Sequence, residues 1–465
     1  MRRLRHLMFG ATSDRAKRLV IGVALSLWLL AGFGTANAQV TPEQQATTAQ
    51  GPDEPPLIAP VEALLPSRTN QLSIGQWLLF PTVDMYTAYD TNIHSSPVAP
   101  LSGPELHFHP SLLADLDTGI HDTKVYGNID SQVYPTLDYQ NNTFDRQAGV
   151  LETYSPLPDL DFTLQGDYSH HTNANVLTNS IPTPVTSAAT PAQIGANGVV
   201  AGQQIIVDPN DSYTLTGGIV KDFNRAFVKL SGSILHTDYE VPYQTTSISN
   251  YSTQSYNGAG GFWLTPWFYA FADGTEAFTQ PAVGVSSDSF RARGGIGSAP
   301  IGLFKGAIYY GEQGTEAASE TAGGDIYGGE ITYVPTVALN LGLSVDRLRN
   351  VSNITSGTTL ALGGLPFVGA GIPTTASTEI TTVAFKSNYA YSPETFIFGV
   401  LSDSRIAYLN TSRVDNSWLA SVGVQHQILD DLSMSFSYQY TDYVSSEPMT
   451  SFTRSLVSLG ANYRF

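Results

Sequence analysis

The last eleven residues of the chain, SLVSLGANYRF over positions 455–465, decide its fold class. Apolar and polar side chains alternate along this stretch. Its apolar positions are Val457, Leu459, Ala461, Tyr463 and Phe465, and Ser458, Gly460, Asn462 and Arg464 lie between them. Such alternation gives a strand with one apolar and one polar face, and outer-membrane barrels commonly end on such a strand. The sequence therefore predicts an all-β transmembrane barrel.

The opposite end of the chain has the form of an export signal. Six Lys and Arg residues precede an apolar run at 19–31, and the small residues Ala36 and Ala38 follow it. This order of charge, apolar run and cleavage site predicts a signal peptide at 1–38, cleaved near Ala38. An uncleaved membrane anchor is the alternative interpretation. The cleavage site carries no cysteine, which excludes lipoprotein anchoring.

Composition narrows the class further. The chain has 24 Tyr, 21 Phe and 42 Gly, only 13% charged residues and no Cys. Aromatic residues spread along the chain without long apolar blocks fit a barrel in which every second side chain faces lipid. Without residues 1–38 the chain keeps 16 Lys and Arg against 39 Asp and Glu, a formal charge of −23. Such acidity argues against a nucleic-acid partner.

Three regions follow along the chain. Residues 39–79 are rich in Pro, Gln and Thr without a sustained period, which predicts a flexible periplasmic leader. The short segment 60–65 within it is a candidate helical turn that plugs the barrel. Alternating residues from about 80 to 465 predict the barrel domain itself.

Turn signals divide this domain into strands. Short turns are predicted around 221–224, 265–266, 298–300, 334–336, 392–394 and 430–431, and longer polar loops at 91–104, 171–210, 237–253, 350–377 and 444–453. Strict alternation of short and long connections predicts an antiparallel up-and-down barrel with an even strand number and both termini in the periplasm. We expect about 18 strands, with 16 as the alternative. The rival architecture is a secreted β-sandwich or solenoid with its apolar faces buried inside.

One short motif resembles a known family. Residues 89–93, Tyr-Asp-Thr-Asn-Ile, are similar to the sequence that ends the first strand of β-barrel porins of the "porin 2" type, which are Gram-negative outer-membrane proteins of about this length. The resemblance covers residues 81–465 and implies a porin-like barrel. Some members are similar to barrels of exopolysaccharide export systems, so glycan export is an alternative that the resemblance brings with it.

Alternation also predicts which charged side chains line the lumen. Arg291 and Arg293 lie between lipid-facing positions, and Lys305 does so on the next strand. These three form a candidate basic ladder. By the same reasoning Asp130, Asp167, Glu330 and Lys386 face inward. Separated basic and acidic strips select solutes by charge, whereas charges that pair with one another merely line a polar interior, and the sequence leaves both alternatives open. It also leaves open whether cations or anions are preferred.

Enzymatic chemistry finds little support. His107 and His109 share a strand face, but their spacing fixes no third metal ligand. No Gly-x-Ser-x-Gly nucleophile signature occurs, and an aspartyl protease site would have to arise from scattered loop Asp and His residues. The chain also lacks a phosphate-binding loop, so any export would be powered elsewhere. We expect no enzyme and no cofactor.

Passive diffusion of small hydrophilic solutes through an outer-membrane pore is the function that the sequence favours. The alternatives are exopolysaccharide export and a closed structural or surface-interaction barrel. The weakly charged loop segment 182–202 is the best candidate for a constriction. Expected partners are outer-membrane lipid, a small solute or glycan, the barrel assembly machinery that reads the terminal Phe465, and further copies of the chain in a homo-oligomer.

Overall fold

The computed structural model describes residues 72–93, 95, 97–136, 142–172, 174–176, 205–207, 209–239, 250–282, 286–317, 320–353, 375–409, 411–447 and 450–465. The predicted signal peptide, the segment 60–65 and the loop segment 182–202 lie outside these ranges. Among the described residues no helix is long and apolar enough to span a bilayer.

The described chain is built of strands. They are β1 (Leu72–Ile74), β2 (Trp77–Asp90), β3 (Gly103–Asp117), β4 (His121–Val133), β5 (Thr143–Leu157), β6 (Leu160–His171), β7 (Ala174–Val176), β8 (Ile205–Val207), β9 (Asn210–Phe223), β10 (Ala226–Tyr239), β11 (Tyr251–Trp263), β12 (Phe268–Pro281), β13 (Ser287–Ser298), β14 (Phe304–Ala317), β15 (Glu320–Thr336), β16 (Leu339–Asn353), β17 (Thr375–Ser392), β18 (Thr395–Tyr408), β19 (Val414–Gln427), β20 (Leu432–Ser445) and β21 (Phe452–Arg464). β2–β6 and β9–β21 close into an antiparallel barrel of 18 strands.

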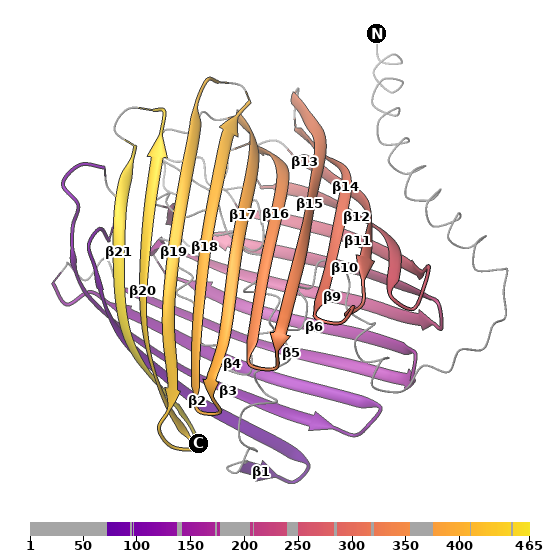
Figure 1. Ribbon diagram of the computed structural model, residues 1–465, viewed down its shortest axis with the longest axis horizontal. Helices are drawn as coiled ribbons and strands as arrows, with labels where there is room; N and C mark the ends of the chain where they lie inside the picture. Colours follow the sequence, from indigo (N-terminus) through magenta and orange to yellow (C-terminus); the bar gives the residue numbers. More distant parts are fainter. Residues whose placement is uncertain are drawn as a thin grey trace.

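Each barrel strand pairs with its neighbour in sequence, β6 pairs with β9, and β21 pairs back onto β2. In Figure 1 the strands of the near wall, such as β18 and β19, cross those of the far wall, such as β3 and β4, because barrel strands tilt relative to the barrel axis. β7 and β8 form a separate two-stranded ribbon. The predicted fold class and the expected number of 18 strands are confirmed.

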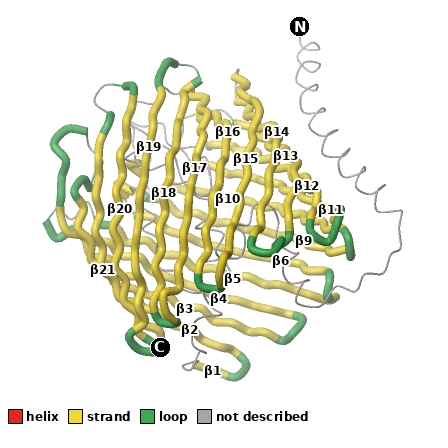
Figure 2. The backbone as a smooth tube through the Cα atoms, in the orientation of Figure 1, coloured by secondary structure: helices red, strands yellow, loops and turns green. Residues whose placement is uncertain are grey.

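The two ends of the barrel differ. One end, here called the turn end, carries connections such as 118–120, 158–159, 224–225 and 393–394, together with the terminal Phe465. The other, here called the loop end, carries most of the longer connections. Connections join the strands at both ends in Figure 2. The strict alternation of short and long connections is wrong between β12 and β15. The loop-end connection 282–286 is no longer than the turn-end connection 299–303, and residues 318–319 alone join β14 to β15 at the loop end.

One predicted turn is also wrong. Residues 334–336 belong to β15, where the pairing with β16 is irregular between Tyr333 and Thr336, and the chain turns two residues later. Pro335 lacks an amide hydrogen and interrupts the ladder, so it marks the irregularity and not the turn itself. The turn predicted at 221–224 likewise comes late, at 224–225, where Asn224 has a positive φ of 26°.

Side chains alternate between the two faces of the wall as predicted. Large apolar residues at every second position are exposed on the outside, for example Leu230 at 53%, Ile308 at 66% and Val422 at 53%. Phe465, Tyr463 and Leu459 belong to this outer surface. Ser458 and Asn462, at the positions between, are buried against the interior. An apolar outer surface around a polar interior is the arrangement of a barrel that spans a membrane.

The barrel closes where β2 meets β21, and the motif 89–93 lies at this seam. Asp90 is fully buried and forms an ion pair with Arg454, whose side chain is 5% exposed. The Asn92 amide nitrogen donates to Asp90 Oδ1 at 2.8 Å, and Asn92 Nδ2 donates to the Thr453 carbonyl at 3.1 Å. The motif therefore ties the first barrel strand to the last.

Inside the barrel, aromatic side chains lie over glycines of the next strand. A Cβ added at Gly295 would collide with the backbone carbonyl oxygen of Ile308 and with the ring of Phe271, whereas one added at Gly166 would meet no atom within 4 Å. We expect Gly295→Ala to destabilise the barrel by about 1–3 kcal/mol and Gly166→Ala to have no such cost. Urea unfolding of the two refolded variants in lipid vesicles checks this. Equal midpoints would contradict the tight packing.

Candidate functional site

The candidate functional site is the inner face of the barrel wall. All seven charged residues proposed from the sequence lie at inward positions: Arg291, Arg293, Lys305, Asp130, Asp167, Glu330 and Lys386. The structure divides them between two walls. Asp130 and Asp167 lie on β4 and β6, while the other five lie on β13, β14, β15 and β17.

The five residues on β13–β17, together with Asp273 on β12 and Asp346 on β16, form what we call the mixed-charge strip. Its centre is Arg293, which forms an ion pair with Asp273 at 2.9 Å. Both side chains are only 6% exposed. The Arg293 guanidinium also lies 4.6 Å from the centre of the Tyr309 ring. This arginine is therefore held in the wall.

The rest of the strip is also balanced. The Tyr309 hydroxyl donates to Asp346 at 2.7 Å. The carboxylate of Glu330 interacts electrostatically with Lys305, Lys386 and Arg293. The basic ladder predicted from the sequence thus has acidic partners on neighbouring strands, which reduces its field in the lumen. Alternation alone places Asp273 and Asp346 inward as well, but which charges meet depends on the register.

The opposite wall, which we call the acidic wall, carries little compensating charge. Inward positions of β2–β6 hold Asp84, Asp90, Glu105, Asp115, Asp122, Asp130, Asp145, Asp161 and Asp167. Among the described inward positions of these five strands, only Lys124 carries a permanent positive charge, and it pairs with Asp122. Arg454 of β21 pairs with Asp90. The wall as a whole is therefore negative.

Histidines lie among these acids near the loop end. We define the acid–histidine cluster as Asp84, Glu105, His107, His109, Asp130, Asp145 and His171. His109 Nδ1 lies 3.6 Å from Asp84 Oδ2, and His171 Nδ1 lies 3.2 Å from Asp145 Oδ2. His107 stacks on Tyr86 with ring centres 3.9 Å apart.

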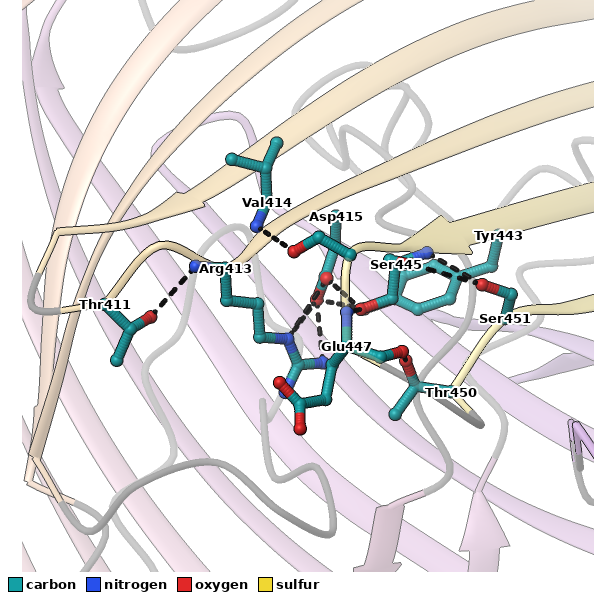
Figure 3. A network of polar contacts seen from close by, with 10 residues as sticks. Thr411, Arg413, Val414, Asp415, Tyr443, Ser445, Glu447, Thr450 and Ser451 are labelled. Carbon is teal, nitrogen blue, oxygen red and sulfur yellow. Dashed lines mark hydrogen bonds and ion pairs between the residues drawn. The ribbon is translucent and has the colours of Figure 1, made fainter.

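A second network fixes the loop end of β18–β21 (Figure 3). Arg413 makes a two-pronged contact with Asp415, with Nε 2.9 Å and Nη2 2.8 Å from Oδ2. The Tyr443 hydroxyl donates to the same oxygen at 2.6 Å, and Ser445 donates to Oδ1. Asp415 is fully buried and so well supplied with donors that the network is a structural tie between two loops.

The wall of β18–β21 is uncharged over most of its inner face. It presents hydroxyl and amide groups at Ser402, Ser404, Ser417, Ser421, Ser437, Gln439, Thr441 and Ser458. The sequence alone does not single out this wall, because its Ser and Thr residues carry no charge. The alternation of polar and apolar residues over 433–441 does place them inward. All eight side chains are buried, and two of the hydroxyl groups, those of Ser437 and Ser458, bond to each other at 2.5 Å.

The described part of the chain holds no cluster with the geometry of a metal site. Within the described ranges no group of three or more His, Cys, Asp and Glu side chains has the geometry to hold a metal ion, so His107 and His109 gain no third ligand there. The motif 89–93, which stands out by its family resemblance, has a structural role in joining β2 to β21.

Comparison with known proteins finds solved structures of low similarity. No family model matches the chain, and no curated protein does. Among solved structures, the Pseudomonas aeruginosa protein OpdL has 10% identity and a TM-score of 0.44, covering 84% of this chain and 99% of its own. A bacterial polysaccharide outer membrane secretin has 8% identity and a TM-score of 0.38, covering 84% and 100%. At such values the neighbours do not identify what passes through this barrel, and the "porin 2" resemblance stays a prediction.

Proposed function

We propose that this protein is a porin-like channel of the Gram-negative outer membrane that lets small hydrophilic solutes diffuse passively and prefers cations. Its turn end would face the periplasm and its loop end the cell exterior, as in barrels of this kind. The closed 18-stranded wall with an apolar outside and a polar inside supports the channel.

The observation that carries the charge preference is the inequality of the two walls. Cations of the mixed-charge strip have acidic neighbours, as Arg293 has in Asp273. The acidic wall has few basic neighbours, and Asp130 on it leaves 49% of its side chain exposed. An uncompensated negative wall concentrates cations along its surface and repels anions.

A planar-bilayer measurement tests this proposal. Purified protein refolded into a bilayer should give discrete conductance steps, and under a potassium chloride gradient the reversal potential should have the sign of a cation-selective pore. The opposite sign would refute the charge preference while leaving a channel. If the protein is shown to be folded as a barrel and yet gives no conductance, the channel itself is refuted.

Exopolysaccharide export is the second candidate, which enters through the resemblance of residues 89–93 to a porin family with members similar to export barrels. A neutral glycan would pass through such a barrel by hydrogen bonds and not by charge. Here a neutral oligosaccharide should interrupt the current at low concentration. If only charged solutes do so, diffusion of small ions and solutes remains the better account.

A further inference from the structure

We propose that the acid–histidine cluster is a binding station for organic cations that carry an ammonium or guanidinium group. This inference rests on the proposed channel and names a class of solute that the channel would hold on its way through. Five inward strand segments, on β2–β6, contribute to the station.

The first observation is a pair of like charges in register. Asp130 on β4 lies directly opposite Asp145 on β5, and both face the lumen. Like charges at directly opposite positions, with Cβ atoms about 5 Å apart, destabilise a sheet unless something between them is positive. Among the described residues no Lys or Arg forms an ion pair with either carboxylate.

The second observation is a buried imidazole without hydrogen bonds. The side chain of His107 is 7% exposed, and neither ring nitrogen makes a hydrogen bond. Its Nε2 lies 3.5 Å from Glu105 Oε1, and its Nδ1 lies 3.8 Å from Asp130 Oδ1. Asp130 Oδ1 is likewise buried without a hydrogen bond. His107 thus faces a carboxylate on each side at ion-pair distance, while Asp130 Oδ1 keeps an unused acceptor site that a ligand with donors can fill.

The site is open to the lumen on one side. Side-chain exposure is 49% for Asp130, 48% for His171 and 34% for His109. Asp145 is oriented from behind, because the Thr172 amide nitrogen donates to its Oδ1 at 2.8 Å and the Thr172 hydroxyl at 3.1 Å. One carboxylate is thus fixed in place while its neighbour faces solvent.

The chemistry of these groups favours an organic cation over a bare metal ion. No described group has metal-binding geometry, so the acids do not converge on one point. An ammonium group has three donors and a guanidinium five, in fixed directions that reach separate oxygens at about 2.7–2.9 Å. Carboxylates spread over neighbouring strands suit such a ligand.

Binding and current block by spermidine provide the test. Isothermal titration of the refolded protein in detergent at pH 8 should show binding to the wild type. Single-channel recordings should show brief interruptions that increase with spermidine concentration. In the double variant Asp130→Asn/Asp145→Asn the dissociation constant should rise about tenfold or more, since two charge-assisted contacts are lost.

The matched control is Asp325→Asn/Asp403→Asn, which removes two exposed acids from the outer face of β15 and β18. It should leave spermidine binding unchanged, and the uncharged triethylene glycol should neither bind nor block. Equal binding by both double variants, or no binding to the wild type, would overturn the station. If the protein conducts but does not bind spermidine, only this inference is refuted. If the folded protein does not conduct, the channel is refuted, and the titration then still decides whether the station exists.

Discussion

Arg454→Met is expected to destabilise the barrel by about 3–5 kcal/mol, because it leaves a buried charge without a partner. Asp90 is fully buried, and Arg454 is the cation that pairs with it. The loss falls on the one pairing that joins the first barrel strand to the last. Urea unfolding in lipid vesicles, followed by tryptophan fluorescence, measures the change.

Two further variants separate the charge effect from lost packing. The double variant Arg454→Met/Asp90→Leu removes both charges and should recover most of the stability, as buried pairs replaced by apolar residues often do. Arg146→Met removes an exposed arginine of the outer face and should change stability by less than about 0.5 kcal/mol. If Arg454→Met behaved like Arg146→Met, the seam would not depend on this ion pair.

The seam between β2 and β21 also shows which contacts can be predicted from the sequence and which cannot. Alternation places Asp90 and Arg454 on inward faces, since each strand has a period of two. Nothing local says that they meet, because they are 364 residues apart and pair only when the barrel closes. The motif 89–93 draws notice by resemblance, while the reason for its Asp and Asn appears only in the contacts with β21.

The same division holds for the lumen. Inward and outward faces follow from the spacing of apolar residues, which is why Arg291, Arg293 and Lys305 can be placed inward from sequence. The acidic partners of this ladder depend on register, and a shift of two residues would keep every face while changing every partner. Arg293 meets Asp273 because Asp273 and Arg293 are directly opposite in the β12–β13 pair.

Charge selection should follow the acidic wall and not the basic ladder. We expect the triple variant Asp84→Asn/Asp130→Asn/Asp167→Asn to lower the ratio of cation to anion permeability about threefold or more, because it removes three inward charges that have no permanent cation beside them. Arg291→Gln should change the ratio much less, since the mixed-charge strip remains close to neutral. Reversal potentials under a salt gradient measure both.

A matched triple variant on the outer face controls for the change in total charge. Glu312→Gln/Asp325→Asn/Asp403→Asn removes three exposed acids on the outer face, so the formal charge changes by the same amount while the lumen keeps its own. Screening over about 10 Å at 0.1 M salt confines the effect of a charge to its own side of the wall. The inner triple should therefore alter selectivity and the outer triple should not. Equal shifts would mean that the protein's total charge sets the preference, and an unchanged inner triple would mean that solutes pass without contact with the acidic wall.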